Sequence, residues 1–284
     1  VSWNIDHRPK DYFVLLMMLV TGVYGVFLAR DIFFLFFFYE LAVLPMYLLI
    51  GVWGSSSDFG TFLRPKEYGA MKLMLYLVAG SILVWVGLLA TYVESGLGTF
   101  SLVKLTSVEF SSGFQVFFFP LFMVGFGILA GLWPFHTWSP DGHVAAPTSV
   151  SMLHAGVLMK LGAYGILRIG VDLLPHGAEY WMPALMVLGT VNVLYGAVSA
   201  MGQQDLKYVI GYSSVSHMGY VLMGFATLNS IGTGGAVLQM FSHGIMTALF
   251  FALVGAIYDQ THVRDIRVLE GIAKRMNVTG VFFA

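Results

Sequence analysis

The sequence contains no cysteine and few charged residues. Without cysteine among its 284 residues, the chain cannot hold disulfides, iron–sulfur clusters, thiolate metal sites or a cysteine nucleophile. Charged residues make up 10% of the chain, whereas soluble domains carry about 25%. So few charges cannot cover a water-facing surface, and we therefore expect lipid to be the solvent. The net charge of −1 also argues against a nucleic-acid partner.

Apolar residues, 58% of the chain, fall in long runs. A membrane-spanning helix needs about 20 mostly apolar residues, and these runs lack the alternation of barrel strands. The sequence therefore predicts an all-α, polytopic transmembrane helix bundle that forms a single membrane domain over residues 1–284. The predicted spans are residues 11–30, 32–52, 69–93, 114–135, 148–170, 181–202, 205–226 and 235–258.

The two ends of the sequence bear on its extent. The chain starts at Val1, shows no cleavable signal peptide, and ends in an apolar stretch over residues 281–284. We expect it to be an internal piece of a longer protein.

Basic residues in the connecting segments predict the orientation. The positive-inside rule makes the side with more lysine and arginine cytoplasmic. That side carries Arg8, Lys10, Arg64, Lys66, Lys207, Arg264, Arg267, Lys274 and Arg275, against Arg30, Lys104 and Arg168 on the other.

A polar, proline-containing segment over residues 133–143 interrupts the apolar pattern. Proline breaks the hydrogen-bond ladder of a helix. If the segment lies at membrane depth, its freed backbone groups must face protein or water, as in the broken helices of transport proteins. The alternative is an ordinary loop outside the membrane.

Glu40 and Lys160 each lie near the middle of a predicted span. A charge at that depth costs roughly 2.5–3.5 kcal/mol on insertion scales, so both are functional candidates. Burial disfavours the ammonium form of Lys160 and a nearby carboxylate favours it, so the side chain can load and release a proton. The alternatives are a fixed ion pair, a neutral carboxyl or a snorkelling lysine.

Other charged residues lie near the ends of the predicted helices. Lys72 is a few residues inside the third span, where its stem can reach the interface, and it is a weaker candidate for proton transfer. Asp205 and Lys207 open the seventh span, where an acidic residue suits the positive end of the helix dipole. We interpret these two as an anchor.

His154, His217 and His243 each lie within a predicted span, with serine, threonine and tyrosine hydroxyls nearby. Histidine relays protons near neutral pH, so these residues suggest a polar axis with Lys160 and Glu40. A haem-b carrier is a different possibility, but no span holds two histidines spaced for stacked haems. No dinucleotide or phosphate-loop motif and no Ser-His-Asp signature is present, and no metal site is expected.

Five stretches of the sequence carry recognisable motifs. They are Phe38-Tyr39-Glu40-Leu41 with Pro45-Met46-Tyr47; residues 134–148, which include His136, Asp141 and His143; residues 155–165 around Lys160; Asp205-Leu206-Lys207 with residues 212–219; and residues 239–244. In these stretches the sequence resembles the antiporter-like membrane subunits of complex I, the proton-pumping NADH:quinone oxidoreductase, and most closely its M subunit (chain 4). The resemblance covers nearly the whole chain and extends to Mrp-type antiporter subunits.

The resemblance implies a fold of about fourteen helices with two inverted repeats, each containing a broken helix. The eight spans match the fourth to eleventh helices, so the second repeat is incomplete. The implied proton carriers are Glu40, Lys160, His217 and His243, to which the reading of the residues adds Lys72 and His154. His136, Asp141 and Lys207 belong to structural motifs.

The same resemblance implies the setting of the chain. Its partners would be other membrane-arm subunits in a bacterial inner membrane or an organellar energy-transducing membrane. FMN, iron–sulfur clusters and quinone would bind in those partners, with no cofactor and no redox catalysis in this chain.

One position departs from the family pattern. The family has a lysine nine residues before the Trp138 position, where this chain has Leu129. That lysine pairs with the glutamate matched by Glu40, so Glu40 needs another partner (Lys72 or a histidine), is neutral, or acts differently. A cation/proton antiporter subunit, a membrane-bound hydrogenase subunit and a scaffold that has lost translocation remain alternatives.

Overall fold

The computed structural model describes residues 2, 5–58 and 63–283. Within them the chain is almost entirely helical, with one small hairpin of strands β1 (Ser57–Asp58) and β2 (Leu63–Arg64). The helices are α1 (Pro9–Leu28), α2 (Ile32–Trp53), α3 (Lys66–Ser95), α4 (Leu102–Leu105), α5 (Ser112–Ala130), α6 (Trp138–Ala145), α7 (Thr148–Leu153), η1 (His154–Leu158), α8 (Met159–Gly165), η2 (Ile166–Val171), α9 (Pro175–Met201), α10 (Leu206–Ala226), α11 (Ser230–Thr261), α12 (Ile272–Arg275) and α13 (Asn277–Phe283).

Seven segments of the described chain are long and apolar enough to cross a membrane. They are α1, α2, α3, α5, the continuous segment 148–171, α9 and α11. Helix α10 is 21 residues long but less apolar, because it carries three serines and His217. It packs between α9 and α11, which shield it. The predicted all-α membrane bundle is confirmed, although the hairpin was not expected.

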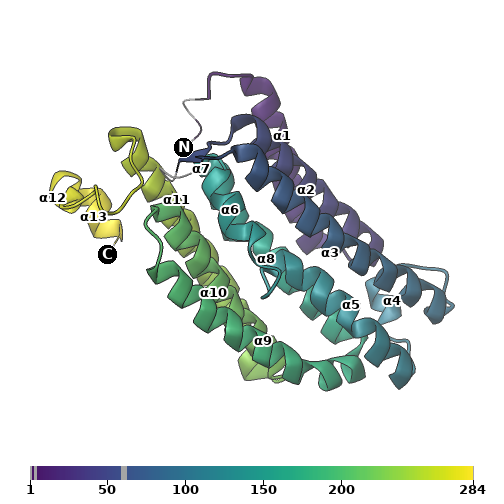
Figure 1. Cartoon of the computed structure of the whole chain (residues 1–284). Coiled ribbons are helices and arrows are strands. Elements are labelled where there is room, and N and C mark those ends of the chain that lie inside the picture. Colours follow the sequence, from purple (N-terminus) through teal and green to yellow (C-terminus); the bar gives the residue numbers. More distant parts are fainter. Residues whose placement is uncertain (1, 3–4, 59–62, 284) are drawn as a thin grey trace.

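The helices form a row of packed pairs (Figure 1). Helices α1, α2 and α3 lie at one edge of the bundle, and α9, α10 and α11 lie at the other. Helix α5 packs on α3, α8 and α9, and α6 packs on α3 and α10. The segment α6–η2 therefore runs through the centre, surrounded by the other helices.

Polar side chains cap the helices where the chain turns. Asp31 accepts hydrogen bonds from the amides of Phe33 and Phe34 at the start of α2. Asp205 accepts from the Lys207 amide at the start of α10, and Asn229 accepts from the Gly232 amide at the start of α11. These side chains satisfy amide groups that have no partner within their own helix.

The polar segment over residues 133–143 is a break within the membrane. Helix α5 ends at Ala130, and α6 begins at Trp138 on the far side of a short turn. The uninterrupted helix α3, 30 residues long, packs against both α5 and α6, so the break lies part-way across the bundle. Of the two interpretations of this segment, the broken helix is correct.

The predicted helix over 114–135 was therefore five residues too long. Gly131 ends it with a φ of 79°, in the left-handed region that favours glycine. Apolar residues continue past Gly131, so hydropathy gives no sign of the end.

The freed backbone at the break is satisfied by two side chains. Asn192 of α9 accepts from the Trp133 amide at 2.6 Å and donates to the Gly131 carbonyl at 2.8 Å. The Trp138 indole donates to the Ile128 carbonyl at 2.9 Å. Irregular backbone is tolerated at membrane depth only where protein or water provides such partners.

Candidate functional site

Lys160 and His243 form a direct contact in the interior of the bundle. Lys160 Nζ lies 2.8 Å from His243 Nδ1, and the two residues are 3% and 1% exposed. Lys160 Nζ also donates to the Ala155 carbonyl across the wide turn η1. Two nitrogen bases at hydrogen-bond distance can pass a proton between them, because one holds it while the other accepts it.

Two glycines allow this contact to form. A Cβ on Gly244 would lie 2.7 Å from the Gly156 carbonyl oxygen, and a Cβ on Gly156 would lie 3.3 Å from the Gly244 carbonyl oxygen. The backbones of α11 and η1 therefore approach more closely than larger residues permit. This approach brings His243 within reach of Lys160.

His217 of α10 continues the axis beyond His243. The two imidazole rings stack with centroids 5.0 Å apart and an interplanar angle of 22°. His217 Nδ1 lies 2.9 Å from Gln239 Nε2, and its ring is half-buried. The rings meet face to face, whereas a haem iron needs two nitrogens that point at it from opposite sides. The arrangement suits proton transfer through a bridging water.

His143 of α6 and His154 of η1 form a second imidazole pair. Their ring centroids are 3.9 Å apart, and both residues are fully buried. The Trp138 indole also stacks on His154, with centroids 5.2 Å apart. The sequence pointed to His154 alone, because His143 falls in the polar segment rather than in a predicted span.

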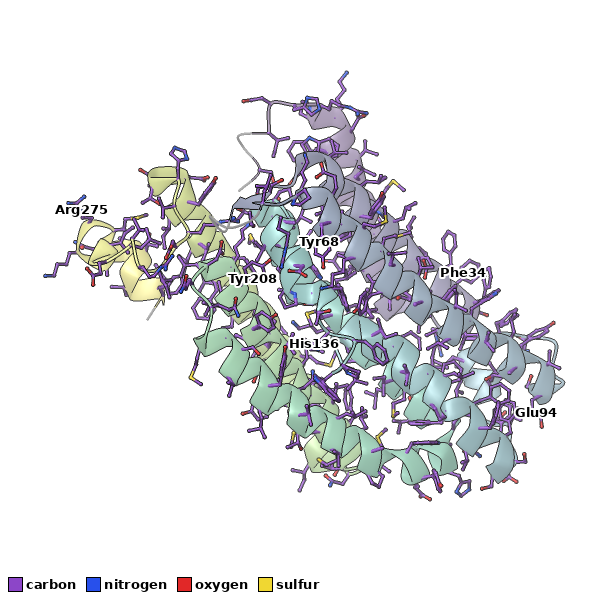
Figure 2. All side chains as sticks on the ribbon, viewed as in Figure 1. Phe34, Tyr68, Glu94, His136, Tyr208 and Arg275 are labelled. Carbon is purple, nitrogen blue, oxygen red and sulfur yellow. The ribbon has the colours of Figure 1, made fainter. Side chains whose placement is uncertain are left out.

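Asp141 of α6 collects three donors on the predicted cytoplasmic side. Its carboxylate lies 2.5 Å from Arg64 Nη1 and 2.8 Å from Lys72 Nζ, and it accepts from the Tyr208 hydroxyl at 2.9 Å. Burial opposes the charge on Arg64, but Asp141 and Tyr208 outweigh it and raise the pKa of the guanidinium. We call these four residues the Asp141 cluster (Tyr208 is labelled in Figure 2).

Glu40 does not pair with Lys72, which was one suggestion for its partner. Ser81 of α3 donates to the Glu40 carboxylate, and Ser81 lies nine residues beyond Lys72, about 13 Å along the helix. Lys72 is held by Asp141 instead. Within the described ranges no lysine, arginine or histidine lies at ion-pair distance from Glu40. Leu129 stands where the resemblance implies a lysine partner for Glu40. Its apolar side chain is fully buried in α5.

Lys207 and Asp205 lie at the start of α10 and contact two other segments of the chain. Lys207 Nζ donates to the Ala146 carbonyl at the end of α6 at 2.7 Å. Asp205 lies 3.3 Å from Arg264 Nε, and Arg264 also donates to the Val144 carbonyl at 3.3 Å. These contacts join α10, α6 and the segment after α11.

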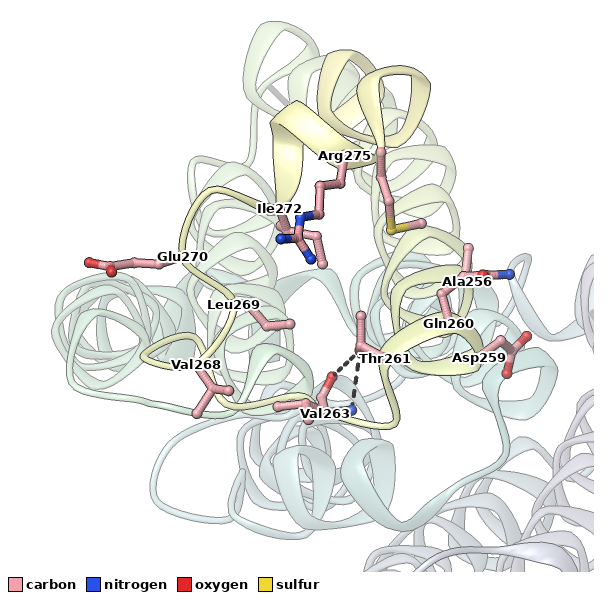
Figure 3. Close-up of a pocket in the computed structure, with 11 residues that line it drawn as sticks. Ala256, Asp259, Gln260, Thr261, Val263, Val268, Leu269, Glu270, Ile272 and Arg275 are labelled. Atoms are coloured by element: carbon pink, nitrogen blue, oxygen red, sulfur yellow. Dashed lines mark hydrogen bonds between the residues drawn. The ribbon is translucent and has the colours of Figure 1, made fainter.

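His136 lies in the turn of the broken helix and is 2% exposed, beside the Tyr195 ring with centroids 4.8 Å apart (Figure 2). A cavity of about 940 Å³ lies between the end of α11 and α12, with Asp259, Glu270 and Arg275 among its lining residues. Figure 3 shows these residues. None of the predicted proton carriers lines this cavity.

Residues 29–284 match the sequence model of one family, described as the transmembrane domain of NADH:quinone oxidoreductases and Mrp antiporters. The chain belongs to this family. The chain is similar to NAD(P)H-quinone oxidoreductase chain 4 of Synechococcus sp. strain JA-3-3Ab, to which it is 39% identical over 275 residues. Those residues are 97% of this chain and 51% of that protein. The chain thus spans about half the length of the curated relatives it matches.

Two solved structures contain chains with the same fold. A chain of respiratory complex I from Thermus thermophilus superposes with a TM-score of 0.86 at 26% identity, over 93% of this chain and 55% of that chain. A chain of the Mrp complex from Dietzia sp. DQ12-45-1b gives 0.74 at 24% identity, over 86% and 44%. The chain is an integral membrane protein of this family.

Proposed function

We propose that the chain is a proton-translocating membrane subunit of an NAD(P)H:quinone oxidoreductase. The observation that carries the proposal is the buried contact between Lys160 and His243. Lys160 has no carboxylate at ion-pair distance among the described residues, so its proton is held by a neutral base and a carbonyl rather than fixed by a counter-ion. A proton held in this way is transferred more readily than a proton held in an ion pair.

The transfer step uses both nitrogens of His243. The Lys160 ammonium donates its proton to His243 Nδ1, which leaves a neutral amine and an imidazolium. The imidazolium then releases the other proton from Nε2, which is buried and has no protein partner among the described residues. Stacked on His243, the half-buried ring of His217 is positioned to receive that proton through water.

The direction of transport follows from the basic residues. Under the positive-inside rule the Asp141 cluster and Lys207 lie toward the cytoplasm, so protons load Lys160 from that side. Quinone reduction takes place in partner subunits, which would also hold FMN and the iron–sulfur clusters. A change in the charges of neighbouring subunits during that reaction would shift the proton affinity of Lys160 and drive release outward. The membrane would be a bacterial inner membrane or an organellar energy-transducing membrane.

Replacing Lys160 by alanine tests this function. We expect Lys160→Ala to reduce proton pumping by the assembled complex in vesicles at least tenfold, because removal of a proton carrier typically costs 10²–10⁴ in rate. Assembly, followed on native gels, should be intact. Pumping at the full rate by Lys160→Ala would overturn the proposal.

Cation/proton antiport is the second candidate, because the family includes Mrp antiporters. The curated relative at 39% identity is a quinone oxidoreductase chain, which favours the first candidate. The subunits that co-purify with the chain distinguish the two: dehydrogenase subunits support the first, and antiporter subunits support the second.

A further inference from the structure

The Glu40 carboxyl accepts one hydrogen bond from the described residues, and its donor is neutral. The Ser81 hydroxyl of α3 donates to Glu40 Oε1, and the Tyr39 hydroxyl lies 3.4 Å from the Ser81 oxygen. Asp141, by contrast, has two cationic side chains and a tyrosine hydroxyl as partners. An ionised carboxylate in a protein interior is stabilised by opposite charges or by several donors. Asp141 meets this condition, whereas Glu40 does not.

The titratable groups of α1 do not compensate a charge on Glu40. Helix α2 packs chiefly on α1 and α3, with a smaller contact to α7, which has no titratable side chain. In α1 these groups are Lys10, Asp11 and Tyr12 in the first turn, and Tyr24, which is 65% exposed. The first turn of α1 lies beside the far end of α2, because Trp53 Nε1 donates to the His7 carbonyl at 2.6 Å. Trp53 is thirteen residues from Glu40, about 20 Å along the helix.

Helices α3 and α5 also leave Glu40 without a cation. The charged residues of α3 lie in its first two turns and in its last turn; they are Lys66, Glu67, Lys72 and Glu94. Of these, Lys72 is bound to Asp141. Helix α5 contains no ionisable side chain, and its Phe126 ring lies against the Tyr39 ring, with centroids 6.3 Å apart. The pair of Glu40 and Ser81 therefore lies in surroundings without a compensating charge.

The outer side of Glu40 faces lipid. Glu40 is eight residues, about 12 Å, from the start of α2. Phe37 and Leu44 lie on the same face of α2, three residues before Glu40 and four after it, and they are 48% and 49% exposed. A charge at this depth is unfavourable unless it is paired. A protonated carboxyl removes the charge and keeps the hydrogen bond from Ser81.

Helix α5 separates this pair from Lys160. It packs on both α3 and α8. A Cβ on Gly80, next to Ser81, would lie 2.8 Å from a carbonyl oxygen of α5, and a Cβ on Gly162, two residues after Lys160, would lie 3.0 Å from the Leu129 carbonyl carbon. The side chain of Leu129 is apolar and fully buried. No side chain of α5 can therefore pass a proton between the two sites.

We propose that Glu40 is a neutral carboxylic acid in this chain, that Ser81 holds it in a hydrogen-bonded pair, and that it keeps its proton while the complex pumps. Ser81 is a positioning residue, because its hydroxyl donates to the carbonyl oxygen Oε1 while the acidic proton resides on Oε2. This role differs from the proton carrier that the resemblance implies for Glu40. The protonation state is independent of the proposed function, whereas the consequence for pumping rests on it.

Infrared spectroscopy of the assembled complex in vesicles tests the protonation state. A protonated carboxyl has a C=O stretching band that a carboxylate lacks. At neutral pH, the difference between the wild-type and Glu40→Gln spectra should contain this band. Ser81→Ala should shift the band to higher frequency, because the C=O group loses its donor. The matched control is Ser95→Ala on the same helix, whose hydroxyl donates to the Tyr92 carbonyl, and it should leave the band in place.

Absence of the band from the wild-type complex at neutral pH would overturn the proposal. If Glu40→Gln does not assemble, the difference between wild type and Ser81→Ala decides, because a protonated Glu40 gives a shifted band there and an ionised Glu40 gives none.

Pumping by Glu40→Gln tests the passive role of the side chain. Glutamine has the shape and the neutrality of a protonated glutamic acid, but it cannot exchange a carboxyl proton. We therefore expect this variant to pump at close to the wild-type rate. A fall of about tenfold or more, as for the loss of a proton carrier, would overturn the passive role. Full pumping by Lys160→Ala would instead overturn the proposed function, and the infrared band of Glu40 would still decide its protonation state.

Discussion

At the scale of single residues, Asn192 shows how one side chain supports the broken helix. It is fully buried in α9, and its amide bonds to the backbone of Gly131, Trp133 and Val215. Asn192 is not among the residues that the sequence pattern predicts to be functional. The available signal was a lone amide within an apolar span, which is expensive in lipid unless it has partners.

Replacing Asn192 by leucine should destabilise the protein. The substitution keeps the volume similar but leaves the Trp133 amide and the Gly131 carbonyl without their partners, at about 1–3 kcal/mol for each group. We expect a lower midpoint in thermal unfolding of the detergent-solubilised protein. The control is Thr190→Val on the same helix, because the Thr190 hydroxyl is exposed and donates to a carbonyl of its own helix. Equal midpoints for the two variants would contradict the role of Asn192.

The Asp141 cluster marks a limit of prediction at this scale. The sequence shows that each of its residues is polar or charged, and it indicates Lys72 as a candidate for proton transfer. Its partner Asp141 is 69 residues away, and Tyr208 is a further 67 residues along the chain. Hydropathy and spacing place residues on helices, but they do not specify which helices meet.

At the scale of elements, the close approach of α11 to η1 sets the geometry of proton transfer. Gly156 and Gly244 face each other across this contact. The distance from Lys160 to His243 thus depends on backbone packing as well as on the two side chains. Long apolar runs predicted these helices well, but the turn η1 and the end of α5 at Gly131 depend on backbone angles that apolarity does not encode.

Substitution of the glycines on α11 tests this dependence. Gly244→Ala places a methyl group 2.7 Å from the Gly156 carbonyl, so α11 must move away and the Lys160–His243 contact must lengthen. We expect proton pumping to fall severalfold in assembled complex. Gly235→Ala, on the same helix, meets open space and should retain full pumping. An unchanged rate for Gly244→Ala would show that the close approach is not required.

At the scale of the whole molecule, the distribution of basic residues predicts which end faces the cytoplasm. Two of these residues, Lys207 and Arg264, lie on a common side, since they donate to the Ala146 and Val144 carbonyls at the same end of α6. Helix α4, which Ser107 closely follows in the sequence, lies at the other end of the bundle (Figure 1).

The lack of cysteine makes this orientation directly measurable. Single substitutions Lys274→Cys and Ser107→Cys, both at exposed positions, introduce the chain's one thiol. In sealed vesicles of known sidedness, a membrane-impermeant maleimide should label position 274 from the cytoplasmic face and position 107 from the opposite face. The reverse pattern would invert the proposed direction of transport.

All eight residues of α6 are buried, so the central half-helix has no surface for lipid. The outer helices α1 and α9 expose large apolar side chains, and they respond to bilayer thickness by tilting. Helix α6 is instead held by the Trp138 indole near the break and by Lys207 and Arg264 at its other end. A change in membrane thickness or lipid composition therefore acts on the outer helices. Helix α6, which carries Asp141 and His143, does not contact the lipid and should keep its position.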